Sequence, residues 1–67
     1  MSRHPEIIVE PFAEYEPGVD GYVVAVVYDY HDGKPLYGLP DWEERGRPDL
    51  APVFSTESAA LVAIARG

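Results

Sequence analysis

The chain has 67 residues, with twelve Asp or Glu against five Lys or Arg and no cysteine. A chain of this length forms one domain, residues 1–67, with a thin core, because a domain of this size buries only about 60% of the surface that its unfolded form exposes. The missing cysteines exclude a disulfide framework and favour a reducing, cytoplasmic setting, while a formal net charge of −7 disfavours direct binding to nucleic acid or an anionic membrane, which are themselves negative.

Residues 6–12 predict the first strand, since residues 7–9 are all β-branched. Pro11 favours a position at the edge of a sheet, because proline cannot donate a hydrogen bond to a ladder. Pro17 and Gly18 then occupy the two central positions of a type II turn. The chain is therefore expected to reverse near residue 17.

Residues 21–30 read GYVVAVVYDY and predict the second strand. Both parities are apolar, which is typical of a central strand covered on two faces. One face would carry Tyr22, Val24, Val26, Tyr28 and Tyr30, and the other Val23, Ala25, Val27 and Asp29. Asp32 and Gly33 fit a tight hairpin turn, after which residues 35–39 return as a short third strand.

Residues 40–52 look irregular, although they contain the signals of one helical turn. Asp41 is suited to cap it and Gly46 to end it. We expect Trp42 to pin this segment onto the sheet.

The last element is predicted to be an α-helix of about eleven residues, capped by Ser55 and closed by Gly67. Its alanines allow close approach to a sheet, so we expect it to dock on the face of small residues, Val23, Ala25 and Val27. The predicted fold class is α+β: a small antiparallel sheet of three or four strands with one C-terminal helix packed on one face.

Catalytic signatures are missing from the sequence. Ser55, Thr56 and Ser58 lie where the helix begins and are explained by capping, whereas Ser2 lies at the chain terminus. No glycine-rich phosphate loop is present, and a general acid would need a buried carboxyl rather than a solvated one. We therefore predict a protein that is not an enzyme and uses no cofactor.

Asp29, His31 and Asp32, which precede Gly33 at the hairpin, are candidate ligands for a divalent metal ion. Their spacing differs from that of a calcium loop. An Asp-Gly pair suits a tight hairpin turn without any metal. The sequence therefore predicts no metal site.

The aromatic residues allow two interpretations. The five tyrosines and Trp42 can fill the core, with residues 40–52 as a lid. Alternatively, Tyr28 and Tyr30 form a secondary contact surface, since Tyr and Trp are enriched at interface hot spots.

The acidic residues are unevenly distributed. Residues 4–33 contain no Lys or Arg and hold seven carboxylates, Glu6, Glu10, Glu14, Glu16, Asp20, Asp29 and Asp32. The first four share one parity and would point the same way along an extended chain. Two strand residues advance about 6.6 Å, close to the roughly 6.8 Å between alternate phosphates of one DNA strand. We therefore expect these seven residues to mimic DNA charge and to bind a basic groove of a nucleic-acid-binding protein.

The small size, the missing cysteines and catalytic motifs, and the one-sided acids together resemble phage-encoded inhibitors, particularly anti-CRISPR proteins. The resemblance concerns the overall character of the whole chain and carries no motif, so no functional residue is transferred. It implies a non-enzymatic protein of the host cytoplasm that binds a CRISPR effector, such as the type I Cascade complex, and blocks target DNA binding.

Two alternatives remain open at the level of sequence. The chain could be a structural or docking module that uses a tyrosine-rich face or a strand edge, as a monomer or homodimer, with acidity serving only solubility. It could also be an antitoxin or a partner of a transcription factor. The apolar runs at 22–28 and 59–65 fall short of the roughly 20 residues of a membrane helix, so we expect a complete, soluble chain.

Overall fold

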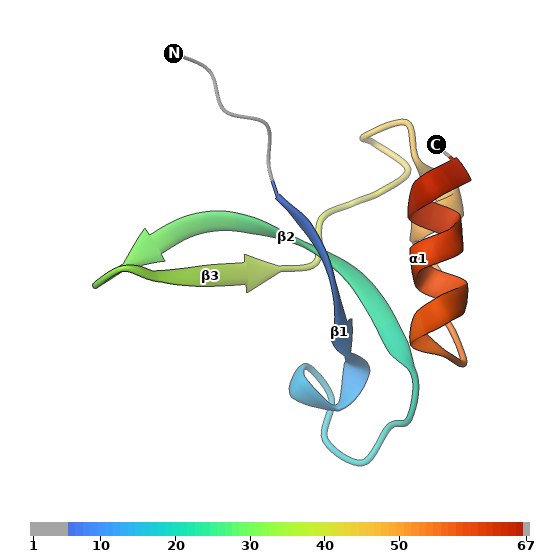
Figure 1. Ribbon diagram of the computed structural model, residues 1–67, viewed down its shortest axis with the longest axis horizontal. Helices are drawn as coiled ribbons and strands as arrows, with labels where there is room; N and C mark the ends of the chain where they lie inside the picture. The colour runs from blue at the N-terminus through green and yellow to red at the C-terminus, as the bar shows by residue number, and fades with distance from the viewer. Residues whose placement is uncertain (1–5, 67) are drawn as a thin grey trace.

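Three antiparallel strands and one C-terminal helix make up the fold, which confirms the predicted α+β class (Figure 1). The computed structural model describes residues 6–66. The sheet has the order β1-β2-β3 and consists of β1 (Ile7–Pro11), β2 (Tyr22–His31) and β3 (Lys34–Gly38). Two short 3-10 helices, η1 (Phe12–Glu14) and η2 (Pro48–Leu50), precede the α-helix α1 (Glu57–Arg66). None of the helices in residues 6–66 is long and apolar enough to cross a membrane.

The two predicted turns are confirmed. Gly18 has a φ of 88° and the Val19 N–H donates to the Glu16 carbonyl at 3.2 Å, as in a type II turn. Asp32 and Gly33 have φ values of 51° and 78°, and positive φ at both central residues is the mark of a type I′ hairpin.

The expected alternation along β2 breaks at Tyr28. Val27 pairs with Tyr37, yet the next pair joins Asp29 to Leu36, so Tyr28 is an extra residue in the strand. A bulge of this kind shifts the following side chains to the other face. The prediction that all five even-numbered residues of β2 share one face is therefore wrong.

Beyond the end of β3, the Trp42 side chain supplies a hydrogen bond to β2. The Val26–Gly38 pair would place Pro40 opposite Val24, but proline has no N–H to donate. The Trp42 indole Nε1–H donates to the Val24 carbonyl instead, at 3.0 Å. The sequence-based expectation that Trp42 pins its segment onto the sheet is confirmed.

The core lies on the face of β2 that carries Val24 and Val26, whereas the sequence predicted that the helix would cover the opposite face. Val24, Val26, Trp42, Leu50 and Ala60 form the buried cluster. The predicted docking of α1 on Val23, Ala25 and Val27 is wrong. Those three residues are buried on the opposite face, beside the side chains of Ile8, Glu10 and Tyr37, with which they pair in register.

The helix packs on the Val24 and Val26 face because other apolar residues also pack there. The α1-facing side gains Trp42 and Leu50 from the segment between β3 and α1, together with Val9 and Phe54. The tyrosines that were expected to share this face do not obstruct the helix, because α1 contacts β1 and β2 but leaves the β2–β3 hairpin uncovered (Figure 1).

The predicted cap of α1 is displaced by one residue. Thr56 is the N-cap, because its Oγ1 accepts the N–H of Ala59 at 3.1 Å, so the prediction of Ser55 is wrong. The helix has ten residues, and the predicted stop at Gly67 lies outside the described residues. The helical turn expected after residue 40 is present, since the Asp41 carboxylate accepts the Glu44 N–H at 3.2 Å.

Both outer strands carry a proline at a position that faces away from the sheet. The Val27 N–H donates to the Glu6 carbonyl and the Phe12 N–H donates to the Gly21 carbonyl, each at 2.9 Å. Backbone groups alternate in direction along a strand, so Pro11 points outward. By the same alternation, Gly38 faces Val26 and Pro35 points outward from β3.

Candidate functional site

Two of the predicted carboxylates lie on the sheet face opposite the helix. Glu10 pairs with Val23, and the Glu6 carbonyl bonds to Val27. Directly opposed residues share a face of an antiparallel sheet, and this face is the one remote from Val24 and Val26. Glu10 lies four positions after Glu6, a spacing of about 13 Å along an extended strand.

Glu14 joins this pair through Tyr15. The Tyr15 hydroxyl donates to the Glu10 carboxylate. Burial raises the pKa of the Tyr15 hydroxyl, and this hydrogen bond and the charges of Glu10 and Glu14 raise the same pKa further. Glu14, in η1, is thus near enough to the Tyr15 hydroxyl for its charge to act on it, while Glu6 and Glu10 share the sheet face. We call Glu6, Glu10 and Glu14 the acidic face.

The expected ladder of four glutamates is wrong. β1 ends at Pro11 and η1 follows at once, so the period-two alternation stops before Glu14 and Glu16. Glu16 lies in the type II turn, exposed to solvent. Asp20 lies elsewhere, in a hollow that it shares with Phe54 and Ser55.

Asp29 and Asp32 belong to the exposed β2–β3 hairpin. Asp29 accepts the Tyr30 N–H at 2.8 Å, and Asp32 lies 3.4 Å from His31. Tyr28 and Tyr30 of the same hairpin are 66% and 55% exposed, so the interpretation of these two tyrosines as core residues is wrong. The structure thus separates the predicted partner-binding residues into the acidic face, the loop and the hairpin.

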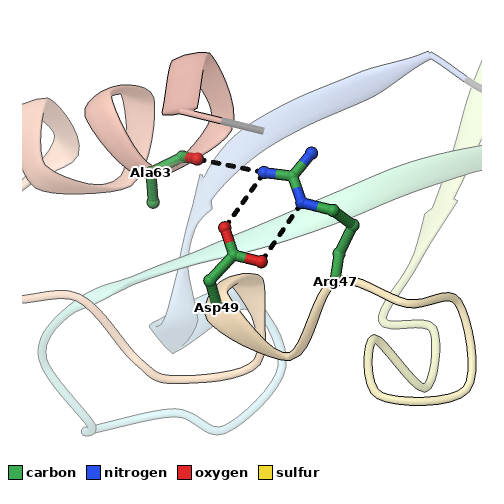
Figure 2. A network of polar contacts seen from close by, with 3 residues as sticks. All are labelled: Arg47, Asp49 and Ala63. Atoms are coloured by element: carbon green, nitrogen blue, oxygen red, sulfur yellow. Dashed lines mark hydrogen bonds and ion pairs between the residues drawn. The ribbon is translucent and has the colours of Figure 1, made fainter.

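The arginine nearest the core is already engaged. Arg47 donates from Nε and Nη2 to the carboxylate of Asp49, at 3.1 and 3.0 Å, and from Nη2 to the Ala63 carbonyl at 3.1 Å (Figure 2). This hydrogen bonding raises the pKa of Arg47 and lowers the pKa of Asp49. The contact links η2 to α1 and engages Arg47 away from the acidic face. Within residues 6–66, the ion pairs are this one and the His31–Asp32 contact.

An apolar hollow lies where β3 ends, and sequence reasoning missed it. Its volume is about 380 Å³. Leu39 and Val53 line it and are 45% and 46% exposed. Trp42 and Leu50, both buried, lie at its base. The signal in the sequence was the pair of apolar residues Leu39 and Val53, which flank the irregular, proline-rich segment 40–52.

Metal-ligating side chains do not cluster in the part of the chain that the structure describes. Within residues 6–66, no three His, Asp or Glu side chains are grouped to hold a metal ion. Thr56 has its hydroxyl engaged in the helix cap. The arrangement is chemically suited to binding through charge and apolar contact.

Comparison of the chain with protein-family models, with curated proteins and with solved structures finds no match.

Proposed function

We propose that the protein is a non-enzymatic inhibitor that binds the cationic surface of a nucleic-acid-binding protein and excludes the nucleic acid. The observation that carries this proposal is the acidic face: Glu6 and Glu10 share one sheet face, Glu14 follows in η1, and no Lys or Arg is paired to them among residues 6–66. A surface built to bind phosphates through Lys and Arg also attracts carboxylates, since both are anionic.

The exposure of the three glutamates determines how much each would contribute to binding. Glu6 and Glu14 are exposed and Glu10 is half-buried, and single exposed ion pairs contribute little affinity. Several carboxylates facing a basic surface instead accelerate association and favour the correct partner. Binding of this kind weakens as salt screens the charges.

The partner class remains the one that the resemblance to anti-CRISPR proteins implies. We propose a CRISPR effector, such as type I Cascade, whose DNA-binding groove is basic. For a phage-encoded chain the site of action is the host cytoplasm. The acidic face would then occupy the path of the target DNA.

A matched pair of double variants tests the proposal. Glu6→Gln with Glu14→Gln removes two charges from the acidic face, whereas Glu44→Gln with Glu57→Gln removes two exposed charges elsewhere and serves as the control. Neither pair disturbs the Tyr15–Glu10 hydrogen bond. Each protein is immobilised, incubated with host lysate at low salt, and washed with rising NaCl.

The wild type and the control should retain a nucleic-acid-binding protein that elutes as NaCl rises, and adding wild type should release DNA from it. The acidic-face variant should retain severalfold less. Equal retention by both variants, or retention that salt does not affect, would contradict the proposal.

A second candidate function is supported by the hairpin. Figure 1 shows the β2–β3 hairpin extending away from α1, and its Tyr28 and Tyr30 are largely exposed. A docking module that uses this hairpin would bind its partner independently of salt and would lose binding on Tyr28→Ala. The strand edges are less suited to this role, because Pro11 and Pro35 face outward from them.

A further inference from the structure

We propose that the apolar hollow at the end of β3 receives one aliphatic or aromatic side chain from a cationic segment of the partner. This inference rests on the proposed function and deepens it, since it names the chemistry of the segment that is bound. The occupant is a peptide in which an apolar residue is flanked by Lys or Arg.

The shape of the hollow suits an apolar anchor. Its base reaches the core at Val24, Trp42 and Leu50, and its exposed lining includes Leu39 and Val53. Its volume of about 380 Å³ lies at the lower end of the range for binding pockets. A buried side chain at the centre of a contact is the usual source of binding energy in an interface.

The charges that line the hollow all have one sign. Asp41 and Glu43 contribute carboxylates, and no Lys or Arg among residues 6–66 lines it. Asp41 is held in place by the hydrogen bond that its carboxylate accepts from the Glu44 N–H. An apolar side chain flanked by cations therefore matches the hollow in both polarity and charge.

The hollow also adjoins the acidic face. Phe12 lines the hollow, and η1 runs from Phe12 to Glu14. A basic segment bound at Glu10 and Glu14 would thus pass the opening of the hollow. The charges would orient the segment, and the anchor would fix its register.

The larger hollow beside α1 does not share these properties. Its volume is about 460 Å³, but Asp49 and Arg66 both line it. Its charges have mixed sign, so it carries no preference for a cationic partner.

Binding to the hollow can be measured by Trp42 fluorescence, because Trp42 is the single tryptophan of the chain and lines the hollow. Three synthetic pentapeptides serve as probes: leucine between two arginines on either side, serine in place of the leucine, and glutamates in place of the arginines. The leucine–arginine peptide should shift the Trp42 emission and bind about tenfold more tightly than the serine peptide. The glutamate peptide should not bind.

Variants locate the contact. Leu39→Gln with Val53→Gln should lose the tenfold preference for leucine, and Glu43→Lys should weaken binding severalfold. Leu61→Gln, on α1 and 51% exposed, is the matched control and should behave as wild type. Leu39 and Val53 are nearly half exposed, and circular dichroism should show that all variants retain the fold.

Equal affinity for the leucine and serine peptides, or no response to any peptide, would overturn the inference. A different result would contradict the proposed function: the variant that lacks the Glu6 and Glu14 charges would retain the partner as well as the control does. Arginine-dependent binding without a leucine preference would thus reject the hollow and leave the acidic face intact.

Discussion

Tyr15 determines how the acidic face is presented. Its ring is half-buried, and its hydroxyl reaches back five residues to the carboxylate of Glu10. A carboxylate that accepts a hydrogen bond from a partly buried phenol has fewer accessible rotamers than a free surface glutamate. The Tyr15 side chain therefore both fills space with its ring and fixes the position of the Glu10 carboxylate.

Replacing Tyr15 by Phe should lower the free energy of unfolding at pH 7 by about 1 kcal/mol, since one hydrogen bond is lost. The pKa of Tyr15 is raised in the folded state, so its contribution is fully present below the unfolded-state value of about 10 and is lost as pH rises above it. Urea unfolding at pH 7 and at higher pH measures the effect.

The difference between wild type and Tyr15→Phe should therefore shrink at alkaline pH. Tyr28→Phe is the matched control, because Tyr28 is 66% exposed and should change stability little. A difference between wild type and Tyr15→Phe that stays constant or grows with pH would contradict the assignment.

At the scale of single elements, the stability of α1 depends on the residue that caps its N-terminus. Thr56 caps the helix through the Ala59 N–H, whereas the exposed Ser55 makes no such bond to any residue in 6–66. Thr56→Ala should lower the free energy of unfolding by about 1 kcal/mol, and Ser55→Ala should leave it nearly unchanged. Urea unfolding followed by Trp42 fluorescence compares the two, and an equal loss in both would show that the cap is shared.

Elements whose signals are local could be predicted from the sequence. The turn at Pro17 and Gly18 and the hairpin at Asp32 and Gly33 each need a backbone conformation that few residues adopt, so their positions follow from residue type. The central place of β2 follows from apolar residues on both of its faces.

Features that depend on distant partners could not be predicted. The bulge at Tyr28 arises from the pairing of β2 with β3, and the face chosen by α1 depends on Trp42 and Leu50 from a segment without regular periodicity. The same holds for the candidate site, because the bend after Pro11 removes Glu14 and Glu16 from the strand alternation, while the Tyr15 hydroxyl reaches back to Glu10.

At the scale of the whole molecule, the net charge of −7 destabilises the folded state. Like charges repel more strongly in the folded state than in an expanded chain, and salt screens this repulsion. The free energy of unfolding should therefore rise between low and moderate NaCl in urea titrations. The rise should be smaller for the variant that lacks the Glu6 and Glu14 charges, and a fall with added NaCl would contradict this account.

The outward prolines of β1 and β3 have a consequence for the behaviour of the protein at high concentration. A new strand adds to a sheet through a continuous row of backbone donors and acceptors, which is also how fibrils template their own growth. Pro11 and Pro35 interrupt that row at each border of the sheet. Protein produced in large amounts should consequently resist conversion into cross-β fibres.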